Sequence, residues 1–178
     1  MFDPQDLTPV TCSSLKTFKL CRKDYNLRFI RGLHALEESE AQYLGSVIHV
    51  ALERWYLRGD AEKDTVVAVI FDYIAASFPN RERDERQKRD WHLARAMFLA
   101  YIETYPTEEF EIVAVEKQFQ CPIINPDTGA ASRSYFMRGK VDALVTRNGE
   151  YFLLEHKTAA VIDKSYIEKL PLDFQVTL

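Results

Sequence analysis

The sequence has no long hydrophobic run and little cysteine, and both shortages narrow the classes of protein it can belong to. No apolar stretch in its 178 residues approaches the ~20 residues that span a bilayer. The N-terminal MFDPQDLTPV lacks the basic and apolar regions of a signal peptide. The cysteines, Cys12, Cys21 and Cys121, are odd in number and widely spaced, which favours a reducing compartment over a disulfide framework. We therefore expect a cytoplasmic protein with no membrane partner.

The chain also lacks an excess of positive charge, but its basic residues are unevenly distributed. The formal net charge is −4 at pH 7, which by itself does not favour nucleic acid as a partner. Residues 16–31 nevertheless carry six basic side chains against Asp24 alone, interleaved with Phe18, Tyr25 and Phe29. A local basic patch is what phosphate contact requires. A solvated helix face explains this feature equally well.

Hydrophobic periodicity predicts helices first and strands afterwards. A first helix is capped by Ser13 or Ser14, a second covers about residues 40–57, a third covers 64–78, and a fourth ends before Pro106. Beyond it, alternation predicts strands in FEIVAVEKQFQCPII, SYFMRGKVDALVT and EYFLLEHKT, then a short helix capped by Ser165. We predict an α/β (α+β) fold with N-terminal helices followed by a mixed central sheet that contains an antiparallel meander. The length predicts a single domain, residues 1–178, with a substantial core, and from the abrupt end at Leu178 we expect this domain to be truncated at its C-terminus.

The dipeptide Asn148-Gly149 is the strongest local signal, because a type I′ hairpin turn needs φ > 0 at both central residues. Counting outwards from this turn places Asp142 opposite Glu155, with Cβ atoms ~5 Å apart. Like charges in that position repel each other and destabilise a sheet. Alternation brings Lys157 onto the same face, opposite Lys140.

Two carboxylates and a lysine that converge in this way indicate a site for a hard divalent cation, which would remove the repulsion. The alternative is a solvent-facing sheet surface with a Lys–Glu charge ladder. Leu144, Leu153 and Tyr151 share the face, so we expect it to be at least partly covered. On geometry alone, neither interpretation prevails.

Two further polar residues stand in structured segments. His49 lies one turn after Gly45, beside the apolar stripe of the second helix, where a histidine is more often a satisfied core residue than a ligand. Glu116 lies in the middle of a predicted strand, where the plain interpretation is one outward position of an alternating pattern.

Taken in order, these residues resemble the PD-(D/E)XK nuclease superfamily, specifically its RecB-like branch. The motifs that carry the resemblance are GSVIH (45–49) for GxxxH, GKVD (139–142) for GxxD and EHK (155–157) for ExK. Gln175 would open a QxxxY motif whose tyrosine would follow Leu178. Each motif is weak alone, but together and in this order they are specific.

The resemblance implies a restriction-endonuclease-like core and a Mg²⁺- or Mn²⁺-dependent deoxyribonuclease, acting as an exonuclease on DNA. It implies a metal held by Asp142, Glu155, the His156 main-chain carbonyl and His49. In this interpretation Lys157 orients the attacking water or neutralises charge on the phosphate. Glu116 holds a second metal or a bridging water, and Gln175 supports Lys157 or contacts the substrate strand.

Other functions remain open at this point. A catalytically inactive nucleic-acid-binding or scaffold domain could share the fold, as could a protein-interaction domain with a structural metal. One sub-branch, which includes AddB and the CRISPR-adaptation exonucleases, holds an iron–sulfur cluster, and Cys21 stands where its first cysteine stands. A cluster needs four ligands, so it requires residues beyond Leu178, and we expect Cys21 to pack as a small hydrophobe. A helicase or recombination partner is not readable from the sequence.

Overall fold

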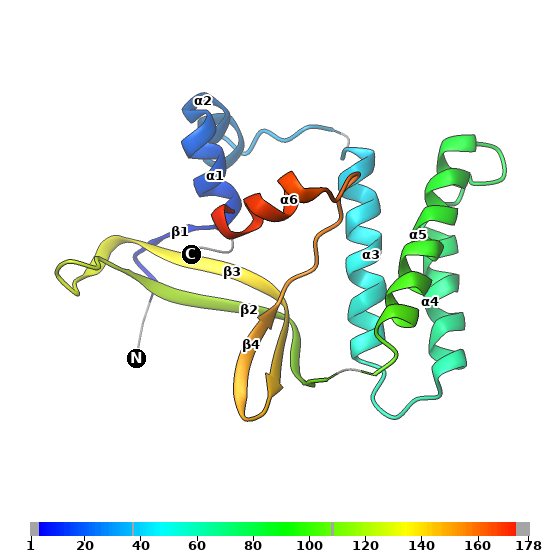
Figure 1. The fold of residues 1–178 in the computed structure, drawn as a ribbon. Helices are drawn as coiled ribbons and strands as arrows, with labels where there is room; N and C mark the ends of the chain where they lie inside the picture. Colours follow the sequence, from blue (N-terminus) through cyan, green and yellow to red (C-terminus); the bar gives the residue numbers. More distant parts are fainter. Residues whose placement is uncertain (1–3, 37, 108, 174–178) are drawn as a thin grey trace. The chain divides into compact units, whose positions relative to one another are not determined.

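The computed structural model of this chain describes residues 4–36, 38–107 and 109–173. Helices dominate the first half and strands the second (Figure 1). The elements are β1 (Thr8–Val10), α1 (Cys12–Leu20), α2 (Arg22–Tyr25), a π-helical turn (Asn26–Ile30), α3 (Glu40–Tyr56), α4 (Lys63–Ser77), α5 (Glu85–Thr104), β2 (Glu111–Ile124), β3 (Ala131–Arg147), β4 (Glu150–Leu154), α6 (Lys164–Lys169) and a 3₁₀ turn (Leu170–Leu172). The predicted order of helices, strands and a final short helix is confirmed.

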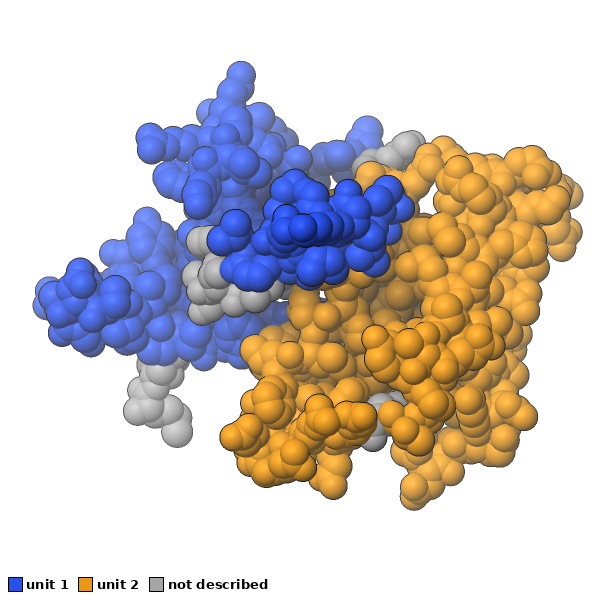
Figure 2. Space-filling view, viewed as in Figure 1, with its two compact units in different colours: residues 1–36, 118–140, 159–178 blue, residues 37–117, 141–158 orange. Residues whose placement is uncertain are grey.

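Backbone contacts divide the chain into two compact units, which Figure 2 colours separately. Unit 1 comprises residues 1–36, 118–140 and 159–178, and unit 2 comprises residues 37–117 and 141–158. The long strands β2 and β3 each contribute residues to both units. That the whole chain is one nuclease domain remains a prediction.

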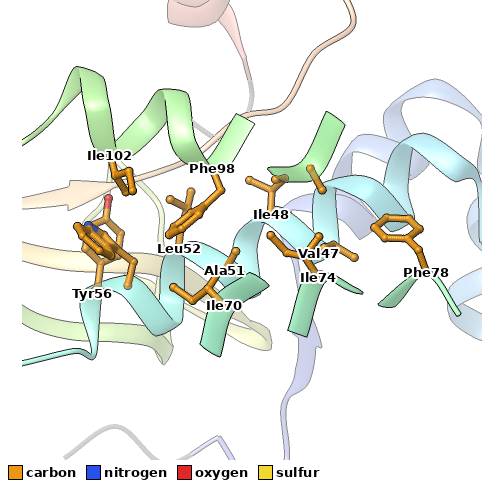
Figure 3. Close-up of a cluster of buried hydrophobic side chains, with 12 residues drawn as sticks. Val47, Ile48, Ala51, Leu52, Tyr56, Ile70, Ile74, Phe78, Phe98 and Ile102 are labelled. Atoms are coloured by element: carbon orange, nitrogen blue, oxygen red, sulfur yellow. The ribbon is translucent and has the colours of Figure 1, made fainter. Parts of the chain in front are cut away.

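The helices α3, α4 and α5 of unit 2 lie side by side and enclose its hydrophobic core (Figures 1 and 3). The stripe predicted for α3 is buried, and Ala51 is 0% exposed. Ile70 and Ile74 of α4 and Phe98 of α5 are likewise 0% exposed. Burying a side chain of this size stabilises a fold by ~1.5–3 kcal/mol. This core therefore fixes α3, the helix that carries His49.

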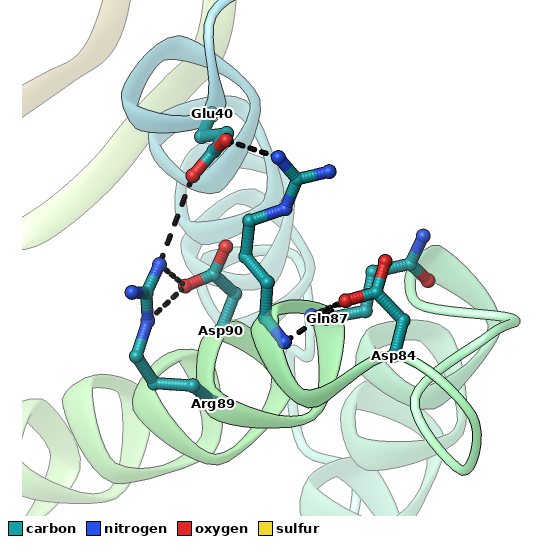
Figure 4. Close-up of polar contacts among 6 residues, drawn as sticks. Glu40, Asp84, Gln87, Arg89 and Asp90 are labelled. Atoms are coloured by element: carbon teal, nitrogen blue, oxygen red, sulfur yellow. Dashed lines mark hydrogen bonds and ion pairs between the residues drawn. The ribbon is translucent and has the colours of Figure 1, made fainter.

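Polar groups at the helix N-termini stabilise the same bundle (Figure 4). Asp84 caps α5 by accepting hydrogen bonds from the backbone N–H groups of Arg86 and Gln87, at 2.9 and 3.3 Å. Glu40, in the first turn of α3, forms an ion pair of 2.5 Å with Arg86. Both ion-pair partners are more than half exposed, so the pair contributes ~1 kcal/mol at most.

The sheet is mixed, as predicted. Its order is β1-β3-β2, and β4 also pairs with β3. Within unit 1, β1 runs parallel to β3, with Thr8 opposite Tyr135. The sequence analysis did not predict β1, because three residues that include Pro9 are too short to show a period.

The hairpin formed by β3 and β4 has the predicted register. Arg147 lies opposite Glu150 and Leu144 opposite Leu153. Both turn residues have positive φ, 54° at Asn148 and 81° at Gly149. The ladder ends at the pair Ala143–Leu154, so Asp142 and Glu155 lie one position beyond it. The expected cover over this face is largely wrong, because Tyr151 and Leu153 are 70% and 67% exposed.

Two predicted caps are also wrong. Thr11 caps α1 and forms a capping box with Ser14, whose side chain bonds back to the Thr11 backbone N–H. Asp163, not Ser165, caps α6 by accepting from the Tyr166 N–H. In both cases the capping residue precedes the predicted serine by two or three positions, and spacing alone does not choose between neighbouring candidates.

Candidate active site

Three side chains from three different elements of unit 2 meet at one point. His49 comes from α3, Glu116 from β2 and Asp142 from β3. Each offers one ligand atom, and these atoms lie within 4.8 Å of one another. Among the residues that the structure describes, this is the group of histidine, cysteine and acidic side chains close enough to hold a metal ion.

The contact between His49 and Asp142 sets the electrostatics of the site. His49 Nδ1 lies 3.2 Å from Asp142 Oδ1, and the two side chains are only 30% and 14% exposed. The hydrogen bond to Asp142 raises the pKa of His49, against the opposing effect of burial. Burial alone would raise the pKa of Asp142, but the hydrogen bonds from His49 and from the His156 N–H outweigh it and lower that pKa. Asp142 is therefore held as a carboxylate, which is the form that binds cations.

Glu116 reaches the site through an unusual backbone conformation. Its φ is 52°, in the left-handed region, inside a 14-residue strand. Ile112 and Val115 both pack against the helical core, although three positions separate them, so strict alternation breaks just before Glu116. A left-handed non-glycine residue costs ~1–3 kcal/mol and is concentrated at functional sites. The interpretation of Glu116 as a plain outward position is thus wrong.

The segment after β4 supplies a second set of polar contacts. The His156 N–H donates to Asp142 Oδ2 at 2.7 Å. Lys157 Nζ donates to Glu155 Oε1 at 2.6 Å. The predicted ladder placed the two carboxylates opposite each other, with their charges uncompensated. In the structure each carboxylate instead has its own hydrogen-bond donor. Since β4 ends at Leu154, Lys157 lies outside the ladder in which it was predicted to face Lys140.

Glu155 lies outside the three-residue group found among the described side chains. It is nevertheless close enough to contribute to the raised pKa of His49, after the larger effects of Asp142 and burial. Its role as a metal ligand, and that of the His156 carbonyl, remain predictions. Gln175 lies outside the described residues.

Two tyrosines that the sequence analysis missed hold the His156 ring. Tyr56 Oη lies 3.0 Å from His156 Nε2 and also hydrogen-bonds with the Tyr101 hydroxyl. Burial lowers the pKa of His156, so the neutral ring is favoured. Tyr56 follows His49 by seven positions, which places both on one face of α3. That spacing is the sequence signal that could have identified it.

Close packing explains why glycine stands at the first position of the GxxxH and GxxD motifs. A Cβ at Gly45 would lie 3.1 Å from Thr158 Oγ1, so glycine lets the segment after Lys157 approach α3. Within unit 1, a Cβ at Gly139 would lie 2.5 Å from the Phe119 ring. Neither glycine has the positive φ that would require it for backbone reasons.

The cysteines correct one further expectation. Cys21 is exposed, and its sulfur accepts a weak hydrogen bond of 3.5 Å from the Asp24 N–H at the start of α2. It therefore does not pack as a small hydrophobe. Cys121 is exposed as well, and Cys12 is half-buried.

The fold and the site agree with the comparison with known families. The chain belongs to the PD-(D/E)XK nuclease superfamily, whose family model matches residues 9–178. A search of curated proteins gives no match. Across the described helices, none has the length and apolarity needed to cross a membrane. Family and geometry together assign a nuclease with a candidate divalent-metal site at His49, Glu116 and Asp142.

Proposed function

We propose that this protein is a Mg²⁺- or Mn²⁺-dependent deoxyribonuclease of the RecB-like branch, acting as an exonuclease. The observation that carries the proposal is the meeting of His49, Glu116 and Asp142 within 4.8 Å, next to a Glu155–Lys157 pair of 2.6 Å. Unit 2 contains all four residues that match the family's motifs: His49, Asp142, Glu155 and Lys157.

The donor set fits a hard divalent cation. It contains two carboxylates, and oxygen is the donor that Mg²⁺ prefers. The lowered pKa of Asp142, which hydrogen bonds produce against the effect of burial, keeps that oxygen ionised. The imidazole of His49 supplies one nitrogen, a donor that makes Mn²⁺ a good substitute for Mg²⁺. When bound, the metal would polarise the scissile phosphate and activate water for its hydrolysis.

The chain's own residues divide the remaining work. Lys157 carries the positive charge that would orient water or neutralise charge building on the phosphate. Glu155 holds Lys157 in place through their ion pair and would complete the metal's ligands with the His156 carbonyl. Gln175 would support Lys157 or contact the substrate strand. The His156 N–H donates to Oδ2 of Asp142, while Oδ1 faces His49.

Three features support DNA as the substrate and an exonuclease mode. The family acts on nucleic acid, the motif spacing resembles the RecB-like branch, and residues 16–31 are basic. We further propose that both units belong to one nuclease domain.

The deciding experiment measures cleavage of end-labelled linear DNA and of covalently closed circular DNA, with Mg²⁺, with Mn²⁺ and with chelator. Wild-type protein should degrade the linear DNA only with metal and leave the closed circle intact. Asp142→Asn and Lys157→Met should each lower kcat by at least ~100-fold, since they remove a metal ligand and the charge at the phosphate. Asp72→Asn, at an exposed position of α4, is the matched control and should behave as wild type.

Cleavage that persists in excess chelator would contradict the proposal. Metal binding without cleavage of any DNA would favour the inactive nucleic-acid-binding domain instead. Glu155→Gln separates the ligand role from the positioning role. If Glu155 is a metal ligand, Glu155→Gln should lower the metal affinity measured by calorimetry. If Glu155 only positions Lys157, the variant should keep its metal affinity and have a lower kcat.

A further inference from the structure

The gap among the side chains of the candidate metal group is too small to hold a base of the substrate. In the described structure, the gap bounded by His49, Glu116 and Asp142 does not admit a water-sized molecule. A much larger cavity of about 580 Å³ lies next to it in unit 2. His156 lines both spaces, and Glu155 also lines the larger one. Any group of a substrate that reaches Glu155 from this side must therefore occupy the larger cavity.

The walls of this cavity are largely aromatic. Tyr101, Tyr105 and Phe110 line it, and the Tyr105 side chain is 54% exposed. The rings of Tyr101 and Tyr105 lie 5.0 Å apart at an angle of 47°, so Tyr105 is supported from one side. Among the charged wall residues, Arg147 and Glu109 form an ion pair of 2.5 Å, and Glu155 forms one of 2.6 Å with Lys157.

These properties match a nucleobase better than a phosphate. A flat aromatic ring that is backed on one side and exposed on the other is a stacking platform. Thr104 and Thr107 line the same cavity, and a threonine hydroxyl can donate to or accept from the edge of a base. A phosphate, in contrast, would meet the carboxylates of Glu109 and Glu155 and would have no unpaired guanidinium to bind.

The volume sets the size of the occupant. About 580 Å³ lies within the ~300–1,000 Å³ range of small-ligand pockets and suits one nucleotide, whereas a base pair with its two backbones is larger. Stacking inside the cavity also requires a base that is not paired or stacked in a duplex.

We propose that this cavity binds the unpaired base of the nucleotide next to the scissile phosphate, with Tyr105 as the stacking residue. The inference rests on the proposed nuclease function and extends it, because it makes an unpaired strand the preferred substrate. The base lies in the cavity, and its phosphate lies towards Glu155 and the candidate metal group.

Binding of single-stranded oligonucleotides that carry one abasic site, moved stepwise along the strand, tests the proposal. Fluorescence anisotropy in chelator gives Kd without cleavage. For the wild type, one abasic position should weaken binding by about tenfold, the loss expected for one stacked base. Tyr105→Ala should bind the intact strand and that abasic strand equally well. Tyr105→Phe keeps the ring and should discriminate like the wild type, as should Tyr151→Ala, which removes a 70% exposed tyrosine elsewhere in the unit.

Cleavage of the same strands with Mg²⁺ distinguishes this proposal from the proposed function. Discrimination by the wild type that Tyr105→Ala abolishes supports the base pocket, even if no strand is cleaved and the nuclease proposal fails. Metal-dependent cleavage with equal Kd at every abasic position supports the nuclease and overturns the pocket. Discrimination that survives in Tyr105→Ala overturns the pocket as well.

Discussion

Glu116 combines a functional carboxylate with a backbone conformation that favours glycine, and the combination can be tested by stability. Glycine inside a strand normally destabilises by ~0.5–1 kcal/mol relative to alanine. At a φ of 52° the order should reverse, because alanine keeps the left-handed strain of ~1–2 kcal/mol and glycine removes it. We expect Glu116→Gly to be more stable than Glu116→Ala by about 1 kcal/mol in urea unfolding.

The matched comparison is Val113, an exposed residue of the same strand with negative φ. There Val113→Gly should be less stable than Val113→Ala. If glycine is the worse choice at both positions, the strain at Glu116 is absent in solution. Both Glu116 variants should lose nuclease activity, since both lack the carboxylate.

At the scale of single residues, motif order was sufficient to select His49 and Asp142, and the structure brings these two together. Glu116 was selected too, but the sequence did not predict its left-handed φ, because no residue typical of turns stands at that position. Tyr56 and Tyr101 escaped selection because their partners lie far along the chain: the Tyr56 hydroxyl contacts His156 Nε2, and the Tyr101 hydroxyl contacts that of Tyr56. Only the packing of α3 against α5 brings those two tyrosines together.

The helix α4 begins at a glutamate, which is an uncommon cap. The Glu62 carboxylate accepts hydrogen bonds from the backbone N–H groups of Thr65 and Asp64, at 2.8 and 3.1 Å. The bond from Thr65 has the larger effect and that from Asp64 the next, and together they lower the pKa of Glu62 below its ordinary value of 4.5. A lowered pKa means that the ionised cap stabilises the fold above pH 4.5, and that this stabilisation is lost as the pH falls through the folded-state pKa.

Glu62→Gln should therefore unfold at a lower urea concentration than the wild type at pH 7. The difference should shrink as the pH is lowered from about 5 to about 3, followed by circular dichroism. Glu82→Gln, at an exposed position of the loop before α5, is the control. A difference that stays constant across this pH range would show that the charge of Glu62 does not contribute.

The helices α1 and α2 of unit 1 carry the basic segment predicted to contact DNA. Two of its cations are already paired within the chain, Lys16 with Asp173 at 2.6 Å and Arg28 with Asp24 at 2.9 Å. Arg22 and Lys23 are exposed, which makes them the better candidates for phosphate contact. The phosphate interpretation thus depends on fewer residues than the sequence pattern indicated.

Reversing both charges, Arg22→Glu with Lys23→Glu, should weaken DNA binding and flatten its dependence on salt. The log–log slope should fall by roughly one unit for each lost phosphate contact. The control is Arg83→Glu with Lys88→Glu, an equal charge change at exposed positions of unit 2. Equal slopes for the wild type and the Arg22/Lys23 variant would show that this segment is a solvated face and that DNA binds elsewhere.

At the scale of the whole molecule, one core holds the elements that build the site. Phe98 is 0% exposed, and its ring lies 5.9 Å from that of Trp55 on α3 and 6.3 Å from that of Phe71 on α4. Replacing it with alanine removes contacts to both helices at once. Phe98→Ala should cost ~3–5 kcal/mol of unfolding free energy, measured by urea denaturation.

The control for Phe98 is Leu93→Ala on the same helix. Leu93 is 43% exposed, so its loss should cost about 0.5 kcal/mol or less. Because α3 carries His49, the Phe98 variant should also lose metal binding at temperatures where the wild type retains it. Equal costs for the two variants would contradict the assignment of the core.

The sequence by itself determined the features that depend on neighbouring residues. Helical period placed α3, α4 and α5, and Asn148-Gly149 fixed the hairpin register, because turn chemistry and side-chain period act over a few positions. Only the tertiary structure decided what depends on distant contacts. It gave Asp142 and Glu155 separate partners in place of mutual repulsion, and it turned Glu116 towards His49. Such contacts join residues far apart in the sequence, 100 positions in the case of Tyr56 and His156, and no local pattern encodes the path that closes them.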